Sequence, residues 1–147
     1  MNKSIILALV LISNTSWAMA SLDSPLGKWK TIDDVTKKPK SIVEITEKDG
    51  MLEGKILKLF REPTEEQNPK CDKCSGERKD KPIIGMNILW NLKKEGSKWS
   101  DGSILDPKNG SRYNSTIKVV DSGKKLDVRG YIGISLLGRT QTWERAE

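Results

Sequence analysis

Beyond about residue 20, the chain consists of short runs in which apolar and polar residues alternate, separated by turn sequences, and helical periodicity is nearly absent. In the segment 41–60 ("SIVEITEKDGMLEGKILKLF"), Val43 and Ile45 alternate with polar residues. A period of two is typical of a half-buried β-strand. The dipeptide Asp49-Gly50 favours a tight turn, because such turns need positive φ. This segment therefore predicts a β-hairpin.

The same alternation recurs to the end of the chain and predicts about eight strands, most of them joined by tight turns. Strong turn sequences include "DPKNG" at 106–110 and "DSGKK" at 121–125. Regular short strands indicate a sandwich or a barrel, and consecutive hairpins favour an up-and-down meander. Since closure removes the exposed edges of such a sheet, we expect one all-β domain, an up-and-down antiparallel barrel of about eight strands.

The first 20 residues have the features of a secretory signal peptide. Lys3 gives a positive start, residues 5–12 ("IILALVLI") form an apolar run, and Ala18 and Ala20 place small residues at a cleavage site. The run is much shorter than the ~20 residues that a membrane-spanning helix needs. We therefore expect residues 1–20 to be a signal peptide that is cleaved near Ala20. The mature barrel domain, 21–147, would be periplasmic or secreted and would have no membrane span.

The charge and residue types of the chain argue against several function classes. The net charge is +6, but the basic residues are interleaved with acidic ones and aromatic residues are few. Nucleic-acid sites instead cluster basic residues and interleave them with aromatics, so we expect no nucleic-acid partner. The chain has no histidine, which removes the commonest general base and metal ligand. We see no catalytic constellation and expect no enzymatic activity, cofactor or metal site.

The polar segment 61–82 predicts a long surface loop between the third and fourth strands, because it lacks periodicity and holds three prolines and both cysteines. Cys71 and Cys74 allow three interpretations. A thioredoxin-type redox motif needs a helix N-terminus, and a structural zinc site needs four ligands. A local disulfide is common in exported proteins, and we expect this third case. The ring would be small and would hold the shape of the loop.

The two ends of the predicted barrel sequence carry tryptophans. Gly27-Lys28-Trp29 opens the first strand, and "GRTQTWER" forms the last, where alternation places Arg139, Gln141 and Trp143 on one face. The first and last strands of a closed meander are neighbours. We therefore expect Gly27, Trp29, Arg139 and Trp143 to form the base of the barrel, with Trp29 buried and Arg139 or Trp143 nearest to it.

A Gly-x-Trp motif on the first strand together with an arginine on the last resembles the lipocalin and wider calycin signature. A longer series of motifs resembles the bacterial domain of unknown function 2147 family over nearly the whole mature chain. These motifs are, in order, "SPLGKWKT", "LEGKI", "CDKC", "KPIIGMNILW", "GSILDPKNGSRY", "LDVRGYIG" and "GRTQTW". The resemblance implies an exported small β-barrel of lipocalin-like form, and it carries no established activity.

An eight-stranded barrel is just wide enough to hold one small ligand. We expect a small hydrophobic or amphipathic ligand in the barrel interior. A buried arginine needs an anionic partner, and a carboxylate or phosphate of the ligand could supply it. The candidate ligand-binding residues are Arg129, Tyr131, Gln141, Tyr113 and Trp90. The arginines could instead pair with an aspartate or lie over a tryptophan at the base. An alternative function is an interaction module whose charged cysteine loop binds an envelope or host-surface protein.

Overall fold

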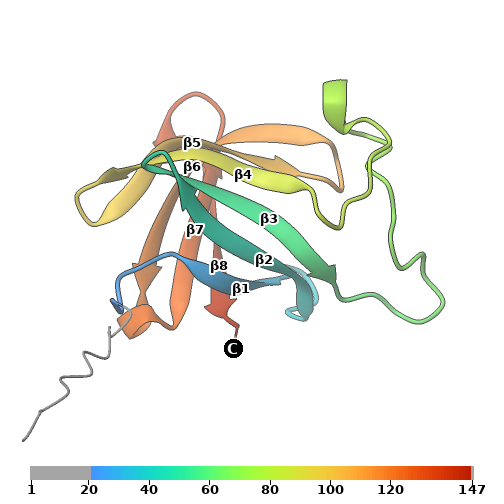
Figure 1. Ribbon diagram of the computed structural model, residues 1–147, viewed down its shortest axis with the longest axis horizontal. Coiled ribbons are helices and arrows are strands. Elements are labelled where there is room, and N and C mark those ends of the chain that lie inside the picture. The colour runs from blue at the N-terminus through green and yellow to red at the C-terminus, as the bar shows by residue number, and fades with distance from the viewer. Residues whose placement is uncertain (1–20, 147) are drawn as a thin grey trace, which may run out of the picture.

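The computed structural model of the protein describes residues 21–146, which form a closed barrel of eight antiparallel strands (Figure 1). Each strand pairs with the next along the chain, and the last pairs with the first. The expected all-β, up-and-down barrel is confirmed. The expected signal peptide falls on residues 1–20, which lie outside the described residues. The strands are β1 (Gly27–Ile32), β2 (Pro39–Lys48), β3 (Met51–Leu59), β4 (Asn87–Glu95), β5 (Lys98–Asp106), β6 (Ser111–Val120), β7 (Lys125–Tyr131) and β8 (Arg139–Arg145).

Strand β2 shows how the alternation of the sequence builds the barrel wall. Ser41, Val43 and Ile45 are buried, and the residues between them are more exposed. This follows from the geometry of a strand, in which successive side chains point to opposite faces of the sheet. The expected turn joins β2 to β3, and both Asp49 and Gly50 have positive φ, 53° and 75°.

The up-and-down order sorts the connections between the two ends of the barrel. The β1–β2, β3–β4, β5–β6 and β7–β8 connections lie at one end, which we call the open end. The β2–β3, β4–β5 and β6–β7 connections lie at the other, the closed end, together with residues 21–26 and the end of β8. Most of the side chains that are at most 1% exposed belong to the closed half, among them Trp29, Val43, Ile45, Leu52, Leu92, Ile117 and Leu126. The barrel interior is therefore filled by packed side chains toward the closed end.

The long β3–β4 connection folds back on itself and contains the short 3₁₀-helix η1 (Gly76–Arg78). Its two arms are joined by backbone hydrogen bonds, from Cys71 N to Lys81 O at 2.8 Å and from Ile83 N to Pro69 O at 2.9 Å. These bonds give an ordered ribbon where the sequence alone predicts an irregular loop.

The expected disulfide between Cys71 and Cys74 is confirmed. However, the expectation that both cysteines lie in a surface loop is wrong, because they are only 0% and 4% exposed and belong to the hydrophobic core cluster. Gly110, in the β5–β6 turn, allows this packing: its φ is +72°, and a Cβ there would clash with the backbone of Lys73. The cysteine turn is thus packed against the barrel.

Candidate functional site

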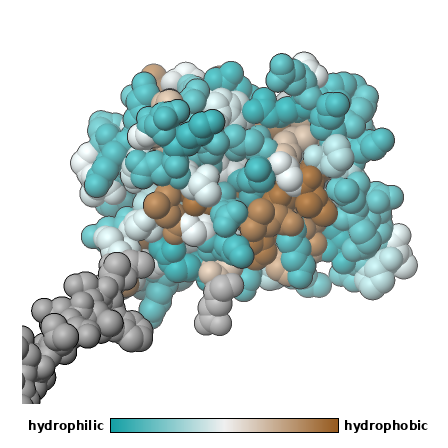
Figure 2. Space-filling view, in the orientation of Figure 1, coloured by the Kyte–Doolittle hydropathy of each residue, from teal (hydrophilic) through white to brown (hydrophobic). Residues whose placement is uncertain are grey.

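A cavity of about 630 Å³ enters the barrel from the open end. Trp143, Val128 and Ile56 form its deep part, and Ile88 and Ile104 add apolar wall. Figure 2 shows hydrophobic side chains gathered in a hollow where β3 and β4 part and the β3–β4 loop begins. The volume lies within the range of pockets that bind small molecules.

The cavity reaches the surface because β3 and β4 separate. Their ladder pairs Met51 through Lys55 of β3 with β4 and ends at Asn87. Beyond this point, Ile56 bonds to the β3–β4 loop instead, accepting from Gly85 N at 2.7 Å and donating to the carbonyl of Met86 at 3.0 Å. The loop therefore continues the barrel wall, and it contributes six cavity-lining residues, Phe60, Arg61, Pro69, Lys70, Asp72 and Ile83.

Charged side chains surround the mouth of this cavity, and the basic ones outnumber the acidic ones. Five basic and two acidic residues line the cavity, namely Lys40, Arg61, Lys70, Lys108 and Arg139 against Asp72 and Asp106. Four of these basic residues, all except Arg139, were not predicted from the sequence, because they lie on separate segments of the chain. Their positions in the sequence could have identified them, since all four lie in or next to connections at the same end of an up-and-down barrel.

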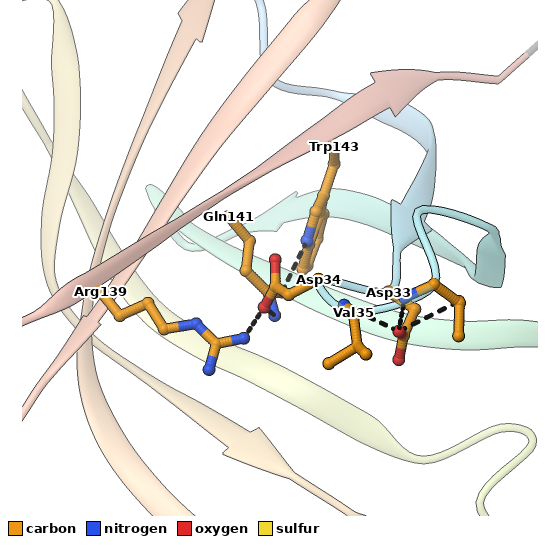
Figure 3. A network of polar contacts seen from close by, with 7 residues as sticks. Asp33, Asp34, Val35, Arg139, Gln141 and Trp143 are labelled. Atoms are coloured by element: carbon orange, nitrogen blue, oxygen red, sulfur yellow. Dashed lines mark hydrogen bonds and ion pairs between the residues drawn. The ribbon is translucent and has the colours of Figure 1, made fainter.

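A chain of polar contacts runs from the mouth to the deep part of the cavity along β8 (Figure 3). Arg139 forms an ion pair with Asp34 of the β1–β2 connection. Gln141 Nε2 donates to the same carboxylate at 2.8 Å, and Trp143 Nε1 donates to Gln141 Oε1 at 3.4 Å. The expectation that Arg139 belongs to the barrel base is wrong, because β8 begins at the open end and the Arg139 side chain is 69% exposed.

The β1–β2 connection that presents Asp34 is held by its neighbour Asp33. The Oδ1 atom of Asp33 accepts hydrogen bonds from Thr36 N at 2.8 Å, Val35 N at 3.0 Å and the Thr36 hydroxyl at 3.1 Å (Figure 3). These bonds favour the charged form. The backbone N–H of Thr36, followed by its hydroxyl, thus lowers the pKa of Asp33.

The closed end is built around Trp29, which has no exposed surface. Its Nε1 donates to the carbonyl of Pro25 at 2.7 Å, and the guanidinium of Arg145 lies 4.1 Å from the ring centroid. The arginine over this indole is therefore Arg145, not the expected Arg139. Trp143 lies one step further into the barrel along the same face of β8, where it lines the cavity.

Arg145 closes the barrel by tying three chain segments together. Nε donates to Gly123 O at 2.6 Å, Nη1 to Leu26 O at 3.1 Å and Nη2 to Ser24 O at 2.8 Å. Partial burial lowers the pKa of its guanidinium. Gly27, with a φ of +113°, lies directly beside it, and a Cβ there would be 3.5 Å from Nη1. No ligand is needed to explain this arginine.

Two of the five expected ligand-binding residues, Tyr113 and Gln141, line the cavity. Arg129 and Tyr131 do not, because they alternate along β7 with the inward Val128 and pair with outward residues of β8 and β6. The expectation that Arg129 forms cavity wall is wrong. Its guanidinium instead bonds to the β7–β8 connection, with Nε donating to Ser135 O at 2.8 Å.

Trp90 also lies outside the cavity. It pairs with Ser103 on the outer face of the barrel, next to the fully buried Leu89. The guanidiniums of Arg78 and Arg112 lie 4.3 Å and 5.3 Å from the centroid of its ring. The expectation that Trp90 contacts a ligand inside the barrel is therefore wrong, and its contacts connect η1 to the outer wall.

The comparisons with known proteins agree with this geometry. Protein HP1028 from Helicobacter pylori, whose solved structure is described as belonging to the lipocalin family, is similar to this chain with a TM-score of 0.71. The sequence identity is 19%, and the match covers 84% of each chain. At this identity the likeness shows the fold alone. A comparison with curated proteins finds no match. Within residues 21–146, no helix is long and apolar enough to cross a membrane.

The family model described as "Uncharacterized protein conserved in bacteria (DUF2147)" matches residues 27–145, which run from the first residue of β1 to the last residue of β8. The resemblance seen in the sequence motifs is confirmed. The chain belongs to the DUF2147 family.

Proposed function

We propose that this protein is an exported carrier that holds one small amphipathic molecule, with its apolar part in the barrel and an anionic group at the mouth. The observation that supports this proposal is the polarity of the cavity itself. The deep part is lined by apolar side chains such as Ile56 and Val128, whereas the basic side chains stand at the rim.

The apolar part of the cavity would supply most of the affinity. Each methylene that leaves water for such a surface contributes about 0.8 kcal/mol. An alkyl chain or ring system would meet Ile56, Ile88, Ile104 and Val128, and would end against Trp143. A polar group at this depth would be costly unless it were hydrogen-bonded.

The basic mouth would select an anionic head group. Arg139 is mostly exposed and is held by one carboxylate, Asp34. Such a surface pair is weak, so a ligand carboxylate can share or replace it at little cost. Thr31 and Ser41 offer a second polar contact, because their hydroxyls, 2.7 Å apart, both belong to cavity-lining residues.

The N-terminal sequence supports the export of the protein. Residues 1–20 have the charged start, apolar run and small-residue site of a signal peptide. The disulfide between Cys71 and Cys74 fits the same location, because disulfides persist in oxidising compartments.

Isothermal titration with decanoate and with decanol would test the carrier directly. The two ligands share an apolar chain and differ in charge. We expect both to bind and decanoate to bind more tightly, because only decanoate gains the charge-assisted contacts at the mouth. The absence of binding by either ligand, or equal affinity for the two, would contradict the proposal.

Paired charge variants locate the head group. The double variant Lys108→Gln/Arg139→Gln removes two charges at the mouth, and Lys93→Gln/Lys94→Gln removes two exposed charges toward the closed end. We expect the first to weaken decanoate binding roughly fivefold while leaving decanol unchanged. The second is the control and leaves both affinities unchanged. Equal losses in both variants would place the head group elsewhere.

A further inference from the structure

The connection between β7 and β8, residues 132–138, carries an unusual set of exposed apolar side chains. Ile132, Ile134, Leu136 and Leu137 are between 61% and 83% exposed, and the segment contains no charged residue. The connection arches beyond the strands that it joins (Figure 1). Exposed apolar residues that occur singly need no explanation, but a contiguous group of this kind marks a surface that contacts something.

Exposed apolar side chains are also unevenly divided between the two ends of the barrel. Among residues 21–146, eight large hydrophobic side chains are exposed. Six of them lie at the open end, the four of the β7–β8 connection together with Val35 and Phe60, whereas Leu22 and Leu26 lie at the closed end. The end that contains the cavity mouth is therefore also the apolar end of the molecular surface.

The β7–β8 connection is held in this shape by polar contacts at its base. Arg129 Nε donates to Ser135 O at 2.8 Å, and Nη1 donates to Thr140 Oγ1 at 2.9 Å. The 3₁₀-helix η3 (Ser135–Leu137) forms the tip. These contacts satisfy the backbone while leaving Leu136 and Leu137 pointing into solvent, so the exposure is built into the fold.

The shape and charge of this end favour a lipid surface as its partner. A protein interface needs about 800 Å² on each side, which a narrow loop tip does not offer, whereas lipid can enclose a protruding apolar tip. Arg139 follows the tip directly, and Lys108 and Lys40 lie at the same end. Basic residues around an apolar tip attract anionic head groups.

We propose that the open end of the barrel docks on anionic membrane surfaces by inserting Ile132, Ile134, Leu136 and Leu137 among the lipids, with the basic residues of the mouth contacting the head groups. Docking in this orientation turns the cavity mouth toward the membrane. It goes beyond the carrier function and does not depend on the cavity holding a ligand.

Co-sedimentation with vesicles of equal parts phosphatidylcholine and phosphatidylglycerol tests this docking. The chain 21–147 is suited to it, because it contains the whole closed barrel and lacks the apolar run at 5–12. We compare Leu136→Ser/Leu137→Ser with a control at the closed end, Leu22→Ser/Leu26→Ser. We expect the loop variant to bind at least about tenfold more weakly than wild type and the control to bind like wild type.

Two further measurements complete the test. Added salt weakens vesicle binding of the wild type, because it screens the basic rim. A second tip variant, Ile132→Ser/Ile134→Ser, reproduces the loss, and both tip variants keep the wild-type unfolding midpoint because the changed side chains are exposed. Three results would overturn the proposal: no binding of the wild type, equal binding of the tip variants and wild type, or a wild-type dimer in solution that the tip variants convert to monomer.

Discussion

The two ends of the barrel use the same kinds of residue in opposite ways. At the closed end, Trp29 and Arg145 are stacked, and each donates to backbone carbonyls of the neighbouring segments. Toward the open end, Trp143 lines the deep part of the cavity, and Arg139 at its mouth faces solvent with one carboxylate as its partner. Arg139 and Arg145 lie on the same strand and on the same face of it.

This difference separates residues that hold the barrel together from residues that are available to a ligand. A tryptophan and an arginine whose polar groups are all bonded within the protein contribute to stability. An exposed arginine at the mouth of a cavity contributes little to stability, and it and the tryptophan that lines the cavity are available to contact another molecule. Changes at the closed end should therefore alter unfolding, and changes at the open end should alter binding.

The largest effect is expected for Trp29→Ala. Removing a fully buried indole leaves a cavity in the solid half of the core, so the variant should lose about 3–5 kcal/mol of unfolding free energy. Urea unfolding measures this loss. The fraction of the variant that remains folded should bind decanoate with wild-type affinity. A Trp29→Ala variant as stable as wild type would show that the closed end does not stabilise the barrel.

The next effect separates the two arginines of β8. Arg145→Met leaves the carbonyls of Gly123, Leu26 and Ser24 without their donor and should cost roughly 2 kcal/mol. Arg139→Met removes an exposed ion pair and should change stability by less than about 1 kcal/mol. Urea unfolding and decanoate titration of both variants give the comparison. If Arg139→Met were the more destabilising of the two, the assignment of the ends would be reversed.

A comparable effect is expected where the β3–β4 loop joins the open end. Replacing Cys71 and Cys74 with serine removes a small ring that should contribute about 2 kcal/mol, and it places hydroxyls at two buried positions. The strand ladders do not depend on this disulfide, so the variant should remain a folded barrel with a lower unfolding midpoint. Circular dichroism during thermal unfolding would show this, and an unfolded double variant at room temperature would contradict it.

The smallest effect concerns pH at the open end. Because the folded state lowers the pKa of Asp33 below its ordinary value of 3.8, its hydrogen bonds stabilise the β1–β2 connection above that value. The contribution is lost as the pH falls through the lowered pKa. The difference in unfolding midpoint between wild type and Asp33→Ala should therefore be present at neutral pH and vanish in strong acid. If the difference in unfolding midpoint between wild type and Asp33→Ala did not change with pH, the charge of Asp33 would not be its cause.

The fold was predictable because it depends on local patterns. Alternation such as that of Val43 and Ile45 marks the strands, and turns such as Asp49-Gly50 mark the hairpins. The outward orientation of Arg129 could have been predicted for the same reason, since inward Leu126 and Val128 alternate along β7 with outward residues. Applying the period of two to that strand would have excluded Arg129 from the cavity.

The neighbour of Trp29 was harder to predict, because it depends on the register between strands at opposite ends of the chain. Trp29 pairs with Arg145, whereas Arg139 lies at the far end of β8. Antiparallel order places the end of β8 beside the start of β1, and the register of this pairing brings Arg145 over Trp29. The burial of Cys71 and the cavity itself could not be predicted, since both depend on where β3 and β4 separate and on how a loop without periodicity packs.

The central claim is that an amphipathic ligand enters from the open end and places its apolar part against Trp143. Decanoate that carries bromine on its terminal carbon tests this claim directly, because bromine quenches a tryptophan only on close contact. Trp143 lines the deep part of the cavity, while Trp29 is sealed at the closed end and Trp90 lies outside. We predict saturable quenching of the wild-type fluorescence that is lost in Trp143→Phe. Quenching that persists in Trp143→Phe, or no quenching of the wild type, would contradict the account.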